Sequence, residues 1–373
     1  MEKRTFDNLG ISPSMLGYGC MRFPEKDGHI DEEYAEQLLD RAYAAGITYF
    51  DTAYPYHGGA SEPFVGRVLD KYPRDSYFLA TKLPLWAVNS LDDAKRLLKE
   101  QLTRLNKDYI DFYLLHAINA ERFHAMRDLG VIDYLVEEKE KGTIRYLGFS
   151  FHDSFEAFKE VITYRKWDFC QIQFNYMDVN EQAGVEGVKL AESLGVPMVI
   201  MEPVKGGTLA KLPENVTDEF KRLRPNDSLA SWALRFVGTF KNVKVILSGM
   251  TERDQLEDNL KTFDKFEDLN DEEMAAVEGT AAALRKRVFN GCTGCRYCMP
   301  CPNGVDIPYN FSIWNEYGMY LNEGHTKWRW NHEISADRKA DNCIKCGACE
   351  EACPQHLSIR DNLEQLSGLL NSL

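Results

Sequence analysis

The sequence contains no apolar run of about 18 residues, the length that a helix needs to cross a bilayer. Its first ten residues, MEKRTFDNLG, include no apolar segment of the kind that directs secretion. It has no flavin motif and no complete G-x-G-x-x-G loop, only Gly17 and Gly19 around Tyr18. We therefore expect a protein that neither spans a membrane nor is exported, with a cytoplasmic location.

Positive charge is scarce relative to negative charge, with 44 Lys and Arg against 58 Asp and Glu and a net charge of −14. An acidic surface is repelled by nucleic acid and by anionic membranes, so neither is expected as a partner. The length of 373 residues, of which 44% are hydrophobic, is enough for one large domain and one small one.

Cysteine is nearly absent from the first three quarters of the chain. Cys20 and Cys170 lie in apolar runs and are interpreted as core residues. The other cysteines form two runs near the end, Cys292, Cys295, Cys298 and Cys301, then Cys343, Cys346, Cys349 and Cys353. The length and the missing secretory segment argue against disulfides, so these runs indicate metal ligands.

The second run has the spacing of bacterial ferredoxins, in which three cysteines hold one 4Fe–4S cluster and the fourth binds another. We expect two 4Fe–4S clusters in this part of the chain, and at the least one cluster. Structural zinc is the alternative, and the triple C-x-x-C-x-x-C followed by Cys-Pro argues against it. The last interval of the first run is one residue shorter, so the sequence leaves open whether Cys301 reaches a second cluster.

Apolar segments of strand length alternate with segments of helical periodicity through the first 285 residues. Strands are expected at 15–23, 48–53, 77–83, 110–116, 144–151, 169–176, 197–203 and 243–249. Helices are expected at 31–45, 91–105, 124–141, 154–164, 181–194, 228–238 and 253–262. The alternation predicts a closed (β/α)8 TIM barrel over residues 1–285, and the missing Gly-rich loop disfavours an open doubly wound sheet.

The tail, residues 286–373, is expected to form a small, mostly helical ferredoxin-like iron–sulfur domain. The forty or so residues between the cysteine runs are rich in Trp and Tyr. Aromatic residues at this density could stack on bases, but the surrounding acidic charge favours a packed helical insert.

Polar side chains occur where the predicted strands end, which is where chemistry lies in such a barrel. They are Asp51, Lys82, His116, Ser150, His152, Asn175, Glu202 and Ser248, with Tyr56 in the loop after Asp51. Burying such groups is costly unless they pair, so we expect them to meet.

These motifs, in this order, resemble the aldo-keto reductase family, and the cysteine tail resembles its iron–sulfur branch. The matching segments are Phe50-Asp51-Thr52-Ala53-Tyr54-Pro55-Tyr56, Ser61-Glu62, Ala80-Thr81-Lys82, Leu114-Leu115-His116, Gly148-Phe149-Ser150, Gln173-Phe174-Asn175-Tyr176 and Glu202-Pro203 with Gly206-Gly207. The resemblance implies an oxidoreductase that reduces a small carbonyl substrate with NAD(P)H, using a tetrad of Asp51, Tyr56, Lys82 and His116.

The chemistry of this tetrad is consistent with that role. Carbonyl reduction needs a proton at oxygen while hydride reaches carbon, and a tyrosine hydroxyl of ordinary pKa near ~10 is a slow donor. A lysine ammonium such as that of Lys82 is expected to lower this pKa, with Asp51 holding the lysine in place. His116 would donate a hydrogen bond to the carbonyl oxygen and orient it.

The resemblance also implies a groove for NADP(H) or NAD(H). Its expected residues are Ser150, Gln173, Tyr176, Glu202, Pro203, Val204, Gly207, Ser248, Gly249, Met250, Arg253, Gln255, Asp258 and Asn259. Gln255 stands where the family often has a basic residue for the 2′-phosphate, and Arg253 could replace it, so NADPH is only mildly preferred. Arg22, Tyr54, Trp86 and His152 are candidate substrate-pocket residues.

The tail leaves three interpretations open, because a nicotinamide delivers two electrons as hydride whereas each cluster passes one. The first, which we favour, is a carbonyl reductase whose clusters are structural or sense redox conditions. The second is a reductase that exchanges electrons with a ferredoxin-like partner through the clusters. The third is a nicotinamide-sensing or docking module with little turnover.

Overall fold

The computed structural model describes residues 1–373, which group into two compact units. The first unit comprises Met1–Gly206 and Ala230–Asn270, and the second comprises Gly207–Leu229 and Asp271–Leu373. The domain boundary at residue 285 remains a prediction, and residues 207–229 and 271–285 are grouped here with the cysteine-rich region.

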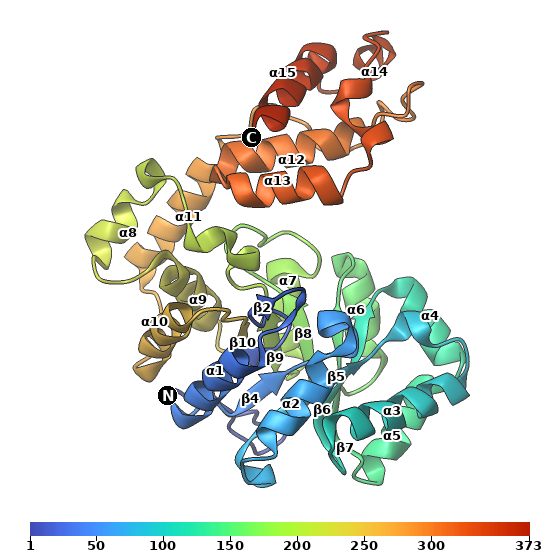
Figure 1. Cartoon of the computed structure of the whole chain (residues 1–373), viewed down its shortest axis with the longest axis vertical. Helices are drawn as coiled ribbons and strands as arrows, with labels where there is room; N and C mark the ends of the chain where they lie inside the picture. Colours follow the sequence, from blue (N-terminus) through green and yellow to red (C-terminus); the bar gives the residue numbers. More distant parts are fainter. The chain divides into compact units, whose positions relative to one another are not determined.

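Eight parallel strands of the first unit close into a barrel in the order β1-β10-β9-β8-β7-β6-β5-β4 (Figure 1). They are β1 (Leu16–Gly19), β4 (Tyr49–Asp51), β5 (Phe78–Leu83), β6 (Ile110–Ile118), β7 (Ile144–Phe151), β8 (Phe169–Gln173), β9 (Met198–Met201) and β10 (Val243–Ser248). Nearly all strand residues are buried, as expected for parallel strands covered on both faces. The predicted (β/α)8 fold is confirmed.

Helices alternate with these strands and form the outer layer (Figure 1). They are α1 (Glu32–Ala44), α2 (Ser61–Leu69), α3 (Leu91–Leu105), α4 (Ala120–Asp128), α5 (Val131–Glu140), α6 (Phe155–Tyr164), α7 (Gly184–Ser193), α9 (Leu229–Thr239) and α10 (Arg253–Asp264). The helix expected over 124–141 is two helices, because Gly130 adopts a left-handed φ of 70° between them. The sequence analysis missed α2 and a small hairpin, β2 (Glu25–Lys26) and β3 (His29–Ile30).

Aromatic and aliphatic side chains fill the amino-terminal half of the barrel. Phe6 comes from the segment before β1 and is fully buried among residues from the starts of several strands. Its ring meets that of Phe112 edge-to-face at 5.7 Å, and Phe112 meets Tyr49 and Phe169 at 4.9 Å each. This end is therefore a packed core, which leaves the carboxyl ends of the strands for polar chemistry.

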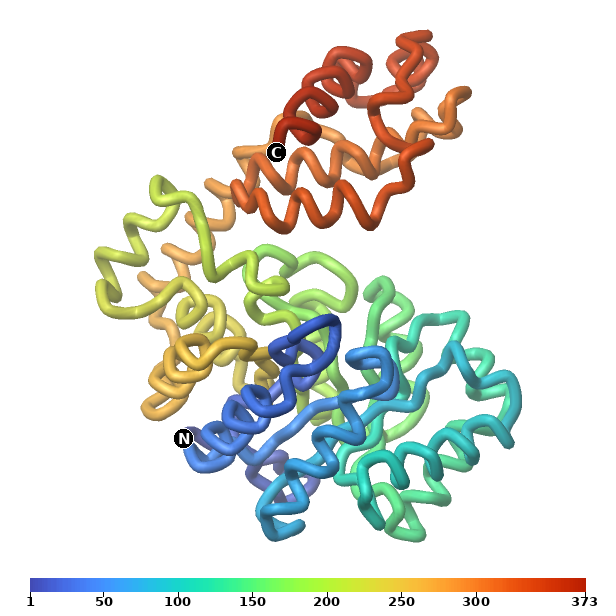
Figure 2. The backbone as a smooth tube through the Cα atoms, in the orientation of Figure 1, coloured from blue at the N-terminus to red at the C-terminus, as the bar shows by residue number.

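The second unit is helical, as predicted. It contains α8 (Asp218–Leu223), α11 (Asp271–Arg285), α12 (Ile307–Tyr320), α13 (Glu323–His332), α14 (Ala348–Glu351) and α15 (Ile359–Ser372). In the backbone trace, α12 lies beside α13 and α15 (Figure 2). Trp314 and Trp330 are buried in the core that these helices share with Leu366, so both have a packing role. None of the chain's helices combines the length and apolar character that crossing a bilayer requires.

Candidate active site

Three neighbouring strands bring the predicted tetrad to one end of the barrel. Asp51 is the last residue of β4, Lys82 lies near the end of β5, and His116 lies near the end of β6. Tyr56 begins the short 3-10 helix η1 (Tyr56–Gly59) in the loop after β4. Because β4 pairs with β5 and β5 with β6 in parallel, these side chains share the carboxyl end of the sheet.

Lys82 is the centre of this group. Its Nζ lies 2.6 Å from Asp51 Oδ1, 2.8 Å from the Thr52 carbonyl oxygen and 3.2 Å from the Tyr56 hydroxyl. The side chain of Lys82 is 1% exposed and that of Asp51 is 3% exposed. Three oxygen partners use all three ammonium protons, which is what a buried lysine needs to remain charged.

The electrostatics of Tyr56 differ from the sequence-based expectation. Burial raises the pKa of the phenol, and this effect outweighs the opposite influence of the Lys82 ammonium. Burial also acts to lower the pKa of Lys82, but attraction by Asp51 and Tyr56 more than compensates, so that pKa is raised. At neutral pH the site therefore holds a charged lysine beside a protonated tyrosine.

His116 completes the group as a neutral imidazole. Burial, reinforced by the positive charge of Lys82, lowers the His116 pKa to about 2. Its ring lies 6.1 Å from the Tyr56 ring, edge-to-face, and its buried Nδ1 has no hydrogen-bond partner. An unpartnered buried nitrogen is costly in a core, and beside a phenol it offers a place for a polar ligand atom.

The backbone after His116 is bulged. The regular pairing of β6 with β7 shifts between Leu115 and Ile118, and Ala117 adopts a left-handed φ of 50°. The Ala117 N–H donates to Ser150 Oγ at 2.8 Å. A non-glycine residue in this conformation is strained, and such strain concentrates at functional sites.

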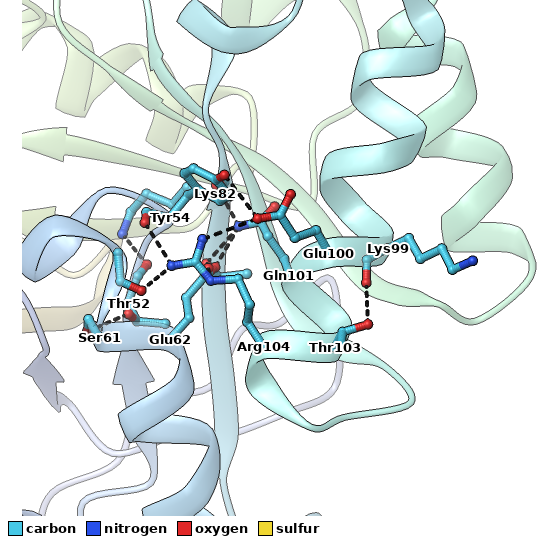
Figure 3. A network of polar contacts seen from close by, with 12 residues as sticks. Thr52, Tyr54, Ser61, Glu62, Lys82, Lys99, Glu100, Gln101, Thr103 and Arg104 are labelled. Atoms are coloured by element: carbon cyan, nitrogen blue, oxygen red, sulfur yellow. Dashed lines mark hydrogen bonds and ion pairs between the residues drawn. The ribbon is translucent and has the colours of Figure 1, made fainter.

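A buried hydrogen-bond network next to Lys82 joins strand β5 to helices α2 and α3 (Figure 3). Glu62, on α2, accepts hydrogen bonds from Thr81 Oγ1 and Gln101 Nε2 at 2.7 Å each, and Arg104 lies 3.3 Å from its other oxygen. Gln101 also donates to the Lys82 carbonyl at 3.0 Å. Sequence reasoning missed Gln101 and Arg104, although Gln101 occupies the apolar face of an amphipathic helix, which was a usable signal.

His57 fixes the loop that carries Tyr56. Its Nε2 accepts the Phe23 N–H at 3.1 Å, and its Nδ1 lies 2.8 Å from Glu25 Oε1. His57 itself has a left-handed φ of 51°. The residue next to Tyr56 therefore ties this loop to the one after β1, a role that the sequence analysis did not foresee.

The four candidate pocket residues are not equivalent. The Trp86 ring lies 5.0 Å from that of His116, and His152 is exposed just after β7. The Tyr54 hydroxyl instead donates to Glu100 on α3 at 3.0 Å. Arg22 is exposed and packs over Gly249, where an added Cβ would come within 3.0 Å of it.

The residues expected near a nicotinamide lie at the carboxyl ends of β7 and β8, Ser150 and Gln173 within the strands and Tyr176 after β8. Ser150, Gln173 and Tyr176 are all buried. Gln173 Nε2 donates to Asp178 at 3.0 Å, and Asp178 also binds Lys205 at 2.8 Å. The Tyr176 hydroxyl is buried without a partner, and burial raises its pKa. Such an orphaned hydroxyl fits a site completed by a ligand, although the ring itself is only 2% exposed.

The residues expected along the pyrophosphate follow β9. Glu202, Pro203 and Val204 come directly after that strand, and Glu202 has a left-handed φ of 55°. Gly207, with a φ of 95°, lies in the 3-10 helix η4 (Lys205–Ala210) and is the first residue of the second unit.

On the expected adenosine side, Ser248 ends β10, and Gly249 and Met250 lead on to α10. Asn259 Nδ2 donates to Ser248 Oγ at 2.9 Å, and Asp258 precedes it on the same helix. The two residues considered for a 2′-phosphate are both engaged elsewhere. Gln255 accepts the N–H of Glu252 at 3.2 Å in a capping box and that of Thr251 at 2.9 Å, and Arg253 pairs with Glu257 at 2.8 Å.

The eight clustered cysteines divide between two cavities of the second unit. One is lined by Cys292, Cys295, Cys298 and Cys353, and the other by Cys301, Cys343, Cys346 and Cys349. Each cavity thus takes three cysteines from one run and the last cysteine of the other. Cys301 therefore lines the same cavity as Cys343, Cys346 and Cys349, although the interval before it is one residue shorter.

The arrangement of these thiols bears on the metal. Three cysteines of one run share a cavity with the last cysteine of the other run, which is the exchange that bacterial ferredoxins make between their two 4Fe–4S clusters. This grouping favours iron–sulfur clusters over zinc sites that are each built from one run of four cysteines.

Two family models match the chain. The Aldo/keto reductase family model covers residues 15–282, and the 4Fe-4S dicluster domain model covers residues 291–357. The first match spans most of the chain. The second contains all eight clustered cysteines.

Individual relatives agree with the first match. The uncharacterized oxidoreductase YqkF of Bacillus subtilis is 27% identical over 312 residues, which cover 74% of this chain and 96% of that protein. L-Galactose dehydrogenase of Arabidopsis thaliana is 25% identical over 309 residues, covering 74% and 93%. The holo structure of aldo-keto reductase AKR11C1 from Bacillus halodurans superposes with a TM-score of 0.62 at 29% identity, covering 75% and 96%. This chain therefore belongs to the aldo/keto reductase family and carries a 4Fe-4S dicluster domain after its barrel.

Proposed function

We propose that the barrel catalyses the NAD(P)H-dependent reduction of an aldehyde or ketone to an alcohol, with Tyr56 as the proton donor. The contact of the buried Lys82 ammonium with both Asp51 and the Tyr56 hydroxyl, within 3.2 Å, carries this proposal. A buried charge is costly, and this one contacts the Tyr56 phenol next to the unpartnered Nδ1 of His116. Such an arrangement is expected of an active site rather than of a packed core.

Each tetrad residue then has a distinct task. The carbonyl oxygen would accept hydrogen bonds from the Tyr56 hydroxyl and the neutral His116 ring, which orient and polarise it. Tyr56 gives its proton to that oxygen as negative charge develops there, and Lys82 stabilises the phenolate that remains. Asp51 keeps Lys82 charged and directed, and Tyr56 is finally reprotonated from solvent.

A nicotinamide nucleotide, when bound, supplies a hydride, which carries two electrons and the hydrogen that adds to the carbonyl carbon. The residues proposed to hold it are Ser150, Gln173 and Tyr176 on one side and Ser248, Gly249 and Asn259 on the other. With the proton from Tyr56, this balances the conversion of C=O to CH–OH.

In the second unit, we propose that each set of four cysteines holds one 4Fe–4S cluster. A hydride carries two electrons and a cluster passes one, and the sequence has no flavin motif to join them. Carbonyl reduction would therefore proceed with NAD(P)H alone, and the clusters would stabilise the unit or sense redox conditions.

Electron exchange with a ferredoxin-like partner is the second candidate, and one observation favours it. Tyr297 lies within the first run of cysteines and Ile344 within the second, and their side chains are 70% and 61% exposed. Exposed apolar side chains next to a redox centre are suited to a transient partner contact. Carbonyl reduction driven by reduced ferredoxin without NAD(P)H would favour this candidate.

The test uses the full chain purified without air and analysed for iron and sulfide. Tyr56→Phe should lower the rate of carbonyl reduction by roughly 10²- to 10⁴-fold, because it removes a general acid. NAD(P)H binding, followed by cofactor fluorescence, should be unchanged. Tyr164→Phe, at an exposed position on α6, is the matched control. Comparable turnover by Tyr56→Phe would reject the tetrad, and binding without turnover by the unmodified protein would favour a sensing role.

A further inference from the structure

Arg122 is an arginine of the barrel without a carboxylate partner. It lies in the first turn of α4, just after β6, and is half-buried. Other barrel arginines form ion pairs with acidic side chains, among them Arg41, Arg67, Arg74, Arg104, Arg127 and Arg145. A half-buried guanidinium whose hydrogen-bond acceptor is a carbonyl oxygen still has N–H groups with which it can bind an anion.

The position of Arg122 is set by the residues that carry the candidate site. Its Nη1 donates to the Ala117 carbonyl at 2.8 Å, and Ala117 directly follows His116. Its guanidinium carbon lies 5.9 Å from the centre of the Trp86 ring, which in turn lies 5.0 Å from the His116 ring. Arg122, Trp86 and His116 thus form a continuous wall.

The charge of Arg122 also acts on its neighbours. After burial and the charges of Lys82 and His152, Arg122 also acts to lower the pKa of His116, and it acts in the same direction at His152. His152 feels a stronger, opposite influence from Glu202. Arg122 therefore adds positive charge beside both His116 and His152.

We propose that Arg122 binds a carboxylate on the substrate, so that the preferred substrates are aldehydes or ketones that carry a carboxylate group. This inference rests on the proposed function, which places the carbonyl oxygen between Tyr56 and His116. A guanidinium presents parallel N–H groups that match a carboxylate, and Nη1 is only partly used by Ala117. Trp86, 48% exposed, offers an apolar face for the part of the substrate between its carbonyl and its carboxylate.

The test compares 4-carboxybenzaldehyde with its methyl ester, which has the same carbonyl and ring but no charge. Arg122→Gln keeps a polar side chain with N–H donors and removes the positive charge. It should lower kcat/KM for the acid by roughly 10- to 100-fold, mainly through KM, and leave the ester within about twofold. Arg122→Lys should restore part of the loss. Arg127→Gln, an exposed position on the same helix, is the matched control.

A second measurement does not depend on turnover. Binding of benzoate and benzamide to the cofactor-saturated protein is followed by tryptophan fluorescence. Benzoate should bind more tightly than benzamide, and Arg122→Gln should abolish the difference. Benzoate binding of this kind without turnover of either aldehyde would reject the proposed function and keep the anion site.

Three results would overturn the assignment of Arg122. Equal losses for acid and ester in Arg122→Gln would show that the residue only braces the bulge at Ala117. Turnover of both aldehydes with no preference for the acid would reject the substrate class while keeping the reductase. Tighter binding of inorganic phosphate than of benzoate would reject a carboxylate as the recognised group.

Discussion

Lys82 Nζ lies 2.6 Å from Asp51 Oδ1, and the two side chains are 1% and 3% exposed. Removing two charges from water costs several kcal/mol per ion, and their attraction repays this only when geometry is good and other hydrogen bonds are made. Such a pair adds little net stability, yet the loss of one partner leaves a buried charge. Function and stability can therefore be separated at this pair.

We expect Lys82→Met to lower the free energy of unfolding of the barrel by about 3–5 kcal/mol, because Asp51 is left unpaired. The double variant Lys82→Met/Asp51→Leu should regain most of that loss, since neither charge remains. Both variants should lack carbonyl reduction. Chemical denaturation followed by tryptophan fluorescence measures the first effect, with the exposed Lys99→Met as control. A double variant no more stable than Lys82→Met would contradict the buried-pair interpretation.

The pH dependence of stability should report on His116. Its pKa in the folded protein is lowered to about 2, whereas the unfolded chain has the ordinary value near 6.5. Below pH ~6.5 the unfolded state binds a proton that the folded state does not, so stability falls as the pH decreases. We expect His116 alone to lower the free energy of unfolding by about 1 kcal/mol as the pH falls from 7 to 5.5. His116→Asn should show a correspondingly shallower decline over this range, and identical slopes would exclude a neutral, buried His116.

The eight strands were predictable because most of their residues are apolar, and the observed bounds differ from the expected ones by only a few residues. The helix α2 (Ser61–Leu69) was missed because it is short and begins two residues after Gly59. The break at Gly130 depends on one left-handed backbone conformation inside an otherwise periodic segment. The local pattern of apolar residues therefore predicted the strands more accurately than it predicted where the helices begin and end.

The candidate site was predictable in its strand-end residues and not in its surroundings. The order of Asp51, Lys82 and His116 along successive strands places them together in any parallel barrel. The net direction of the Tyr56 pKa depends on how deeply the phenol is buried, which no spacing reveals. Arg122 and His57 act through contacts with Ala117 and Phe23 that form only in the folded chain.

Nucleotide preference should respond to Glu257. This carboxylate binds both Arg41 and Arg253, and Gln255 is held in the helix cap, so both residues considered for a 2′-phosphate are engaged elsewhere. Glu257→Gln should release Arg253 and raise the ratio of kcat/KM for NADPH over NADH by about two- to fivefold, as expected for an exposed ion pair. Glu186→Gln, on α7, is the control. An unchanged or lower ratio would mean that Arg253 does not face the nucleotide.

The two cysteine cavities predict which cysteines share a cluster, and this grouping differs from the order of the cysteines in the sequence. Cys301 lies in the first run but lines the cavity of Cys343, Cys346 and Cys349. Likewise, Cys353 lines the cavity of the first run. Removing two ligands of one cavity should spare the other cluster, whereas removing one ligand from each cavity should affect both.

Two double variants test this grouping in protein purified without air. Cys301→Ala/Cys346→Ala removes two ligands from one cavity and should lower the iron content from about eight to about four atoms per chain, with one cluster signal intact. Cys298→Ala/Cys301→Ala, within one run, removes a ligand from each cavity and should perturb both signals. The reverse pattern would mean that each run holds its own cluster. Cys170→Ala, in the barrel core, controls for cysteine loss in general.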